Sequence, residues 1–192
     1  MPRTVWRHLS KTTPSELKLA LTLSNGQCFN WKKASDEWVG VIGRNVVGLK
    51  DTNRGVSFRS FGDCKRIDML SQNLEDYFQL NVSMNELCSI WCEKNKSDKR
   101  FAAICKCMRG MRIVRQEPVE CLVSFTCSSN NNISRITLML DRLRSNYGEE
   151  LYKHKTLGSI YAFPDVDRLA KVSESELRDL GFGYRGRALL FL

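Results

Sequence analysis

The stretch WVGVIGRNVVGLKDTNRGVSFRSF, residues 38–61, decides the fold class of this chain. It contains three short apolar runs, at 38–42, 46–49 and 56–61. The runs are separated by Arg44-Asn45 and by Asn53-Arg54-Gly55, which are residue types typical of tight turns. Short apolar runs joined in this way predict neighbouring antiparallel strands, so we expect a meander within a sheet of four to five strands.

The predicted β region extends upstream to residue 16. Leucines at 17, 19, 21 and 23 alternate with other residues, which is the two-residue period of a strand. Ser24-Asn25-Gly26 then supplies a turn, and Phe29 and Trp31 alternate again after it. These patterns predict β structure throughout residues 16–61.

Helical periodicity begins near residue 65. One apolar face there consists of Ile67, Leu70, Leu74, Tyr77 and Phe78. Ser83 and Glu86 are spaced as a capping box, which predicts a helix after them, and Ser173 and Glu176 repeat the spacing. Further helices are expected over 98–109, 118–127 and 133–146, and after Pro164. A sheet followed by separate helices predicts the α+β class.

The chain is basic. Its 192 residues contain 30 Lys and Arg against 21 Asp and Glu, a formal charge of +9, which favours a polyanionic partner. Residues 94–115 hold eight of the basic residues and a single acid, Asp98, so this stretch carries +7. Contact with phosphates and a solvated helix face remain equally good explanations of it.

Several classes of protein are excluded by what the sequence lacks. It has no run of 18 apolar residues, no Walker loop, no Gly-x-Gly-x-x-Gly and no His-Glu-x-x-His. The eight cysteines form no Cys-x-x-Cys pair, and there are only two histidines. We therefore expect no metal, no cofactor, and buried reduced thiols.

Three segments combine polar groups, glycines and aromatics in ways that suit a ligand. They are GQCFNW at 26–31, SSNNN at 128–132, and GFGYRGR at 181–187. Asn132 is also a good N-cap for the following helix, but one cap does not need five polar residues. A helix N-terminus beside side-chain amides suits phosphates and base edges, and an aromatic on a loop can enter a base stack.

Together these segments resemble the eukaryotic 8-oxoguanine DNA glycosylases of the helix-hairpin-helix superfamily. The matching stretches are SELKLALTLSNGQCFNW at 15–31, RQEPVECLVSFTCSSNNNISRIT at 115–137 and LGFGYRGR at 180–187. The resemblance implies a base-excision repair enzyme that removes 8-oxoguanine opposite cytosine from duplex DNA, with an associated AP lyase activity. It also implies a TATA-binding-protein-like N-terminal domain.

The resemblance assigns roles to five residues. Gly26 matches the glycine whose carbonyl accepts a hydrogen bond from N7–H of 8-oxoguanine. Asn130 matches the residue that fills the space left by the extruded base. Arg135 and Arg185 match contacts to the orphaned cytosine, and Tyr184 matches the wedge that helps to kink the duplex.

The resemblance also predicts the domain organisation. We expect a flexible N-terminus at 1–13, an α+β domain at 14–112, and an incomplete all-α glycosylase domain at 113–192 that lacks the helix-hairpin-helix. In the family, the catalytic lysine and aspartate follow the GYR segment, so this chain has no assigned catalytic residue and is expected to be inactive alone.

Two alternatives remain: a non-catalytic isoform that binds damaged DNA or regulates repair, and a fragment from an incomplete gene model. We expect a monomer that binds double-stranded DNA and no membrane. A nuclear location is expected, with mitochondrial import as an alternative because the first fifteen residues carry Arg3, Arg7 and Lys11.

Overall fold

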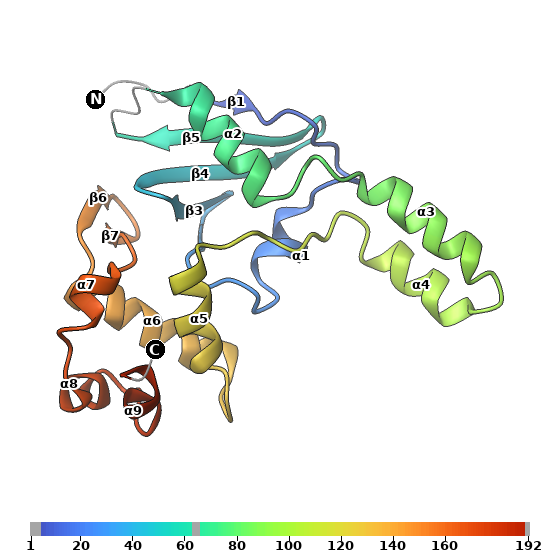
Figure 1. Ribbon diagram of the computed structural model, residues 1–192. Coiled ribbons are helices and arrows are strands. Elements are labelled where there is room, and N and C mark those ends of the chain that lie inside the picture. The colour runs from blue at the N-terminus through green and yellow to red at the C-terminus, as the bar shows by residue number, and fades with distance from the viewer. Residues whose placement is uncertain (1–4, 63–65, 191–192) are drawn as a thin grey trace. The chain divides into compact units, whose positions relative to one another are not determined.

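A computed structural model describes residues 5–62 and 66–190 and divides the chain into two compact units (Figure 1). The first unit consists of residues 1–27 and 31–115, and the second of residues 28–30 and 116–192. Within the described ranges, every helix is too short or too polar to span a bilayer. The α+β class predicted from the sequence is confirmed.

The first unit is built on a five-stranded antiparallel sheet with the order β1-β5-β4-β3-β2. Its strands are β1 (Arg7–His8), β2 (Lys32–Ala34), β3 (Glu37–Ile42), β4 (Asn45–Thr52) and β5 (Gly55–Phe61). The predicted meander is therefore confirmed, with Trp38 opposite Leu49 and Leu49 opposite Phe58. The stretch predicted as a flexible N-terminus contains β1, and its Leu9 and Thr12 are buried.

The leucine-rich stretch at 17–23 is a correction to the sequence analysis, because it forms helix α1 (Leu19–Leu23) instead of a strand. Leu19, Thr22 and Leu23 are buried, and their spacing of three and four residues is that of a helix face. Leu21 is only half-buried. Alternating leucines satisfy both periods over so short a segment, so the packing decides which one forms.

The predicted helices of the first unit are confirmed, as α2 (Ile67–Tyr77), α3 (Met84–Lys94) and α4 (Lys99–Cys107). Helix α2 buries Leu70, Leu74 and Tyr77, which are on its predicted apolar face. Helices α3 and α4 form an antiparallel pair that projects away from the sheet (Figure 1), and neither has a fully buried residue.

A buried ion pair holds the start of α3. The Arg112 guanidinium donates to the Glu16 carboxylate at 2.6 Å, and the Arg112 side chain is 3% exposed. Glu16 also accepts hydrogen bonds from the backbone amides of Met84 at 2.8 Å and Asn85 at 3.2 Å. The predicted capping box at Ser83 is thus only half confirmed: Ser83 accepts from the Glu86 amide, but Glu16 binds the next free amides.

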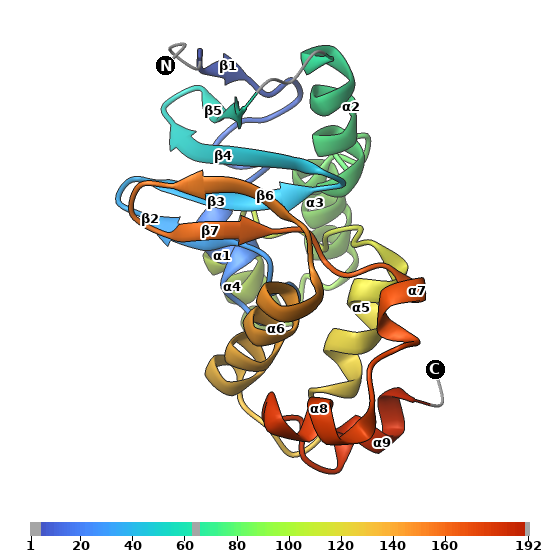
Figure 2. The same cartoon turned by 90° about the vertical axis from the view of Figure 1, so that its left-hand side faces the viewer.

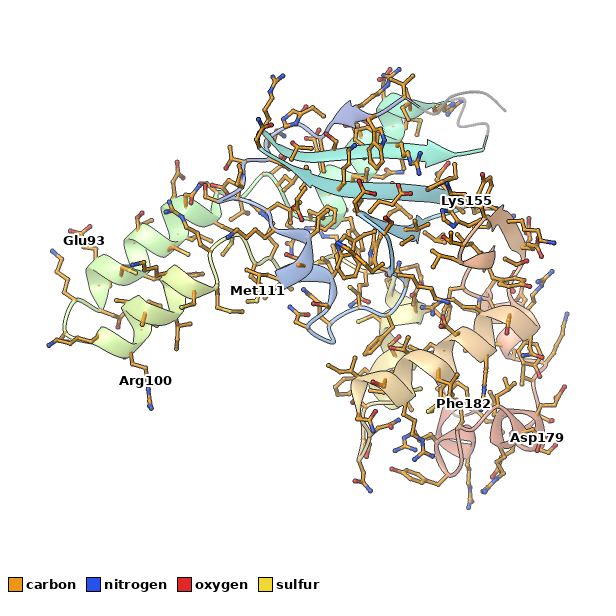
Figure 3. The ribbon with its side chains drawn as sticks, turned by 180° about the vertical axis from the view of Figure 1, so that it is seen from behind. Glu93, Arg100, Met111, Lys155, Asp179 and Phe182 are labelled. Carbon is orange, nitrogen blue, oxygen red and sulfur yellow. The ribbon has the colours of Figure 1, made fainter. Side chains whose placement is uncertain are left out.

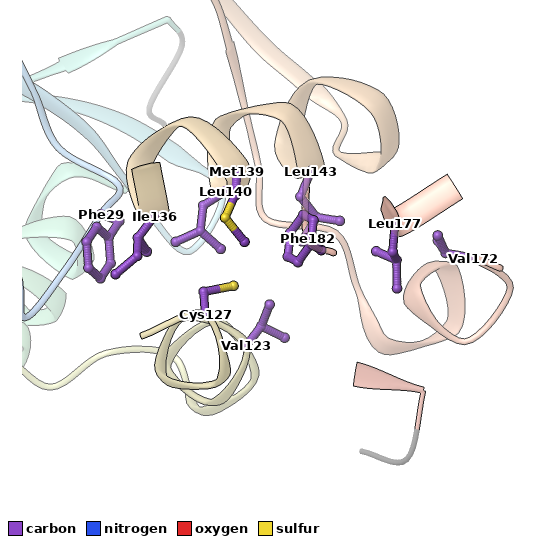
Figure 4. Packing of buried hydrophobic residues seen from close by; sticks show 10 residues of the cluster. All are labelled: Phe29, Val123, Cys127, Ile136, Met139, Leu140, Leu143, Val172, Leu177 and Phe182. Carbon is purple, nitrogen blue, oxygen red and sulfur yellow. The ribbon is translucent and has the colours of Figure 1, made fainter. Parts of the chain in front are cut away.

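The second unit has a core between two helices, α5 (Pro118–Thr126) and α6 (Ile133–Tyr147), both of which were predicted. Pro118 occupies the first turn of α5. Figure 4 shows Val123 and Cys127 on one side of this core and Met139, Leu140 and Leu143 of α6 on the other. Phe182, which is fully buried, joins the same cluster from the C-terminal part of the chain.

The expectation that residues 113–192 are all helical needs correction. Strands β6 (Glu150–His154) and β7 (Gly158–Tyr161) form an antiparallel hairpin. The His154 Nδ1 accepts hydrogen bonds from the amides of Thr156 and Leu157, both at 3.3 Å, and so holds the turn. A side chain that stabilises a turn across two or three residues leaves no apolar period, so the hairpin was not visible in the sequence.

Three short helices complete the second unit: α7 (Val166–Leu169), α8 (Glu174–Asp179) and α9 (Arg185–Leu189). The predicted capping box of Ser173 and Glu176 is confirmed at the start of α8. Gly181 follows this helix at a φ of 96°, as a helix-ending glycine should. Helices α8 and α9 lie next to each other (Figure 2).

The Glu16–Arg112 pair predicts how the stability of the first unit depends on pH. Burial raises the pKa of Glu16, but its hydrogen bonds to α3 and the charge of Arg112 outweigh this and hold the pKa below its usual range. The stabilisation is therefore present above about pH 4.3, the usual value for Glu, and is lost as the pH falls through the lower folded value. Glu16→Gln should cost about 3–5 kcal/mol at pH 7, since it leaves a buried cation unpaired.

Urea unfolding followed by tryptophan fluorescence measures this, because all four tryptophans lie in the first unit. The gap between wild type and Glu16→Gln should shrink as the pH is lowered from 7 to 3. Glu86→Gln is the matched control, since Glu86 is exposed in the first turn of α3. A gap that is absent at pH 7, or equal at both pH values, would contradict the account.

Candidate nucleic-acid interface

Gly26 lies in the first unit, in the turn between α1 and the segment 28–30. Its φ of 86° is in the left-handed region, where a side chain would be strained, so the turn requires glycine at this position. The turn begins with Asn25, whose side chain donates to the Leu21 carbonyl at 3.0 Å and accepts from the Gln27 amide at 3.1 Å.

Gln27 fixes the backbone next to Gly26. Its Nε2 donates to the carbonyls of Thr22 and Arg112, both at 2.8 Å, and its Oε1 accepts from the Val114 amide at 3.0 Å. Because three backbone groups hold one amide side chain, the position of the Gly26 carbonyl is restricted. Sequence reasoning missed this role, since a glutamine in a polar turn has no distinguishing pattern.

In the second unit, the polar loop at 128–132 is ordered by its own side chains. Asn132 is the N-cap of α6, as predicted, and accepts from the Arg135 amide at 2.9 Å. Asn131 donates to the Cys127 carbonyl at 2.9 Å and accepts from the Asn132 amide at 3.0 Å. The loop therefore uses Asn131 and Asn132 to support itself.

Asn130 is different, because its side chain is exposed and its backbone φ is 46°. The left-handed region is unfavourable for most residues, although asparagine tolerates it better than others. This conformation places an exposed amide side chain at the tip of the loop, just before the N-terminus of α6.

The segment at 180–187 presents Tyr184 and buries Arg185. Gly183 has a φ of 58°, which turns the chain after the buried Phe182. Tyr184 is 57% exposed, whereas Arg185 is 3% exposed. A buried guanidinium must be given acceptors, and these come from the loop at 128–132.

Arg185 joins the two segments. Its Nη2 donates to the Ser129 carbonyl and, at 3.1 Å, to the Asn130 carbonyl. The Tyr184 hydroxyl donates to the same Ser129 carbonyl at 3.2 Å, and the Arg185 guanidinium lies 4.5 Å from the centre of the Tyr184 ring. The Nε of Arg185 is buried and has no hydrogen-bond partner in the described part of the chain.

The structure thus brings together three of the five residues singled out in the sequence: Asn130, Tyr184 and Arg185. Arg135 is exposed in the first turn of α6, in the same unit. Gly26 belongs to the first unit, and its own surroundings are those described above.

Another buried arginine, Arg144, organises the second unit and was not singled out in the sequence. It donates to the Glu120 carboxylate at 2.6 Å and to the Phe29 carbonyl at 3.2 Å. The segment that follows the Gly26 turn is therefore bound to α5 and α6. Near Arg185, Cys127 is buried, and burial raises the pKa of its thiol to about 12 although the charge of Arg185 acts in the opposite direction.

The basic stretch at 94–115 does not act as one charged surface. Arg112 is buried against Glu16, and Arg115 pairs with Asp76 at 2.5 Å. Lys96 pairs with Glu93 at 3.5 Å. Among the residues that the structure describes, no group of three or more His, Cys, Asp or Glu could hold a metal ion.

The family model for "8-oxoguanine DNA glycosylase, N-terminal domain" matches residues 10–122 of this chain. The N-glycosylase/DNA lyase OGG1 of Arabidopsis thaliana is 39% identical over 184 residues, which are 92% of this chain and 48% of that protein. The N-glycosylase/DNA lyase of Saccharomyces cerevisiae is 37% identical over 193 residues, again 92% and 48%. The chain spans about half the length of these relatives.

Solved structures agree with the sequence comparisons. The chain is similar to the 8-oxoguanine glycosylase/lyase of Clostridium acetobutylicum in complex with double-stranded DNA that contains cytosine opposite 8-oxoguanine. The TM-score is 0.77 and the identity 26%, over 92% of this chain and 58% of that one. A structure of MBOgg1 in complex with a low-affinity DNA ligand has the same fold, with a TM-score of 0.79, 23% identity, and coverage of 98% and 63%.

The bridge made by Arg185 predicts the mobility of the loop at 128–132. Arg185→Lys retains the charge but loses the planar set of donors, so the Ser129 and Asn130 carbonyls should lose their bonds. Amide hydrogen exchange in the loop should then be about tenfold faster or more, measured by mass spectrometry. Arg187→Lys is the matched control, because Arg187 is exposed in the same helix. Equal exchange in all three proteins would contradict the bridge.

Proposed function

Because the chain belongs to the 8-oxoguanine DNA glycosylase family, we propose that it is part of a repair enzyme that excises 8-oxoguanine opposite cytosine from duplex DNA. The whole enzyme would also have AP lyase activity. The observation that carries the proposal is the bridge from Arg185 to Ser129 and Asn130, because it joins the two loops that the family match assigns to DNA.

Excision needs the damaged nucleotide outside the base stack, since its glycosidic carbon is hidden in the duplex. Extrusion costs a few kcal/mol in lost stacking, which protein contacts must offset. We assign the space of the extruded base to Asn130, whose amide is exposed at the loop tip. We assign the adjacent wedge to Tyr184, whose ring is exposed and supported beneath by the Arg185 guanidinium.

The orphaned cytosine needs partners for its hydrogen-bonding edge. Arg135 and Arg185 are assigned to it, and they approach from different directions of the chain. Arg135 is exposed and unconstrained by burial. Arg185 is held in place by two carbonyls and keeps a buried Nε without an acceptor, which an acceptor on the base would satisfy. A fixed guanidinium loses less conformational entropy on binding than a mobile one.

Gly26 is assigned to recognition of the damaged base. A backbone carbonyl at this position accepts the N7–H of 8-oxoguanine, a proton that guanine does not have. Discrimination by a hydrogen bond is sharp because the wrong base leaves a polar group unpaired. The three bonds of Gln27 supply the required rigidity of the turn.

Binding of a fluorescent 8-oxoguanine:cytosine duplex, measured by anisotropy, tests the assignment. Asn130→Gly removes the side chain but permits the left-handed backbone, so it isolates the amide. Asn130→Gly, Tyr184→Ala and Arg135→Ala should each weaken binding about tenfold or more, since a specific contact is worth roughly 1–3 kcal/mol. Lys153→Ala is the control for Arg135→Ala, because Lys153 is an exposed cation on β6 of the same unit.

Borohydride trapping in the same samples separates binding from chemistry. The family match places the nucleophilic lysine on no residue of 1–192, so we expect duplex binding without a trapped adduct. Unchanged binding in all three site variants would overturn the assigned interface. A robust trapped adduct would show instead that a lysine of this chain attacks the sugar.

A further inference from the structure

Helices α3 and α4 form a pair that has almost no core of its own. No side chain of either helix is fully buried, and the apolar Ile90, Trp91 and Ile104 are each more than 40% exposed. Glu16 holds the start of α3, and Figure 3 shows Glu93 and Arg100 toward the far end of the pair. Two short helices without a buried core are marginal in water, so this end of the pair needs another source of stability.

The interior of the pair is rich in cysteine. Cys88 and Cys92 lie one turn apart on α3, and Cys105 lies on α4. All three are half-buried, whereas Cys107 is exposed. The expectation that the cysteines are buried is therefore confirmed for Cys28 and Cys127 and wrong for the others that the structure describes.

Cys92 and Cys105 meet across the two helices. Their side chains are hydrogen-bonded to each other, which brings the two sulfur atoms into contact. That bond, together with burial, raises the pKa of the Cys92 thiol. Metal binding does not explain the pair, because the described residues contain no group of three possible ligands here.

The surroundings favour oxidation. Lys94, Arg100 and Lys106 are exposed cations on the same two helices, and Lys106 is adjacent to Cys105. Positive charge stabilises a thiolate, and partial exposure admits a small oxidant. Cys127 has the opposite properties, since it is fully buried with a pKa of about 12.

We propose that Cys92 and Cys105 are a modification site, at which hydrogen peroxide or a related two-electron oxidant forms a reversible disulfide that links α3 to α4. The bond would constrain the far end of the pair, as Glu16 constrains its start. This site is independent of the DNA-contacting residues assigned above and lies in the other unit.

The reaction is balanced with peroxide as the oxidant. The Cys105 thiolate attacks one peroxide oxygen, so that an S–O bond forms, the O–O bond breaks, and the departing hydroxide takes up a proton to give water. The Cys92 sulfur, after losing its proton, displaces the hydroxyl from the Cys105 sulfur, which yields the disulfide and a second water. Two thiols are oxidised by two electrons and one peroxide is reduced; an added thiol reverses the linkage by exchange.

Peptide mapping of the intact chain after peroxide treatment tests the proposal. The protein is kept dilute, alkylated and digested without reductant. Trypsin cleaves at Lys106 between Cys105 and Cys107, and chymotrypsin cleaves at Trp91 between Cys88 and Cys92, so each cysteine falls on its own peptide. We expect a dominant Cys92–Cys105 cross-link that dithiothreitol removes. No cross-link, or one made mainly by Cys88 or Cys107, would overturn the proposal.

Matched variants and a structural readout complete the test. Cys92→Ser and Cys105→Ser should each abolish the cross-link, and Cys88→Ser, one turn away on the same helix, should retain it. In the oxidised wild type, amide exchange in 88–106 should slow about tenfold or more and return to its original rate on reduction. Unchanged exchange in a fully cross-linked sample would refute the stabilising role.

Discussion

Burial of a guanidinium group is the constraint on which the functional loops depend. Such a group must be given acceptors when it leaves water, and backbone carbonyls of loops are suitable ones. Three arginines meet this requirement: Arg112 in the first unit, and Arg144 and Arg185 in the second. Each binds a segment that has too few apolar side chains to be fixed by packing.

The three arginines have complementary roles. Arg112 accepts a bond from Gln27 through its carbonyl and so supports the Gly26 turn, while its side chain pairs with Glu16. Arg144 binds the Phe29 carbonyl, and Arg185 binds those of Ser129 and Asn130. Part of the positive charge of this protein is therefore spent on its own loops. The net charge alone says little about where DNA would bind.

The sequence predicted the regular parts of the fold well. Strands β3, β4 and β5 and helices α2 to α6 have enough length for their period to be read, and Asn132 and Ser173 mark helix starts by local hydrogen bonds. It failed where a segment is short or depends on distant partners. Residues 17–23 satisfy two periods, the hairpin at 150–161 is held by His154, and the amides at the start of α3 are bound by Glu16, 67 or more residues away in sequence. Arg185 was singled out as a DNA contact, but its bonds to the other loop follow only from the tertiary structure.

The central claim is that the loops around Asn130 and Tyr184 form one DNA-contacting surface. The most direct measurement is a titration of the isotopically labelled chain with an 8-oxoguanine:cytosine duplex, followed by amide chemical shifts. The account predicts that the amides of 129–132 and 183–185 shift together and fit a single dissociation constant. Shifts confined to the basic residues of α3 and α4, with both loops unaffected, would contradict it.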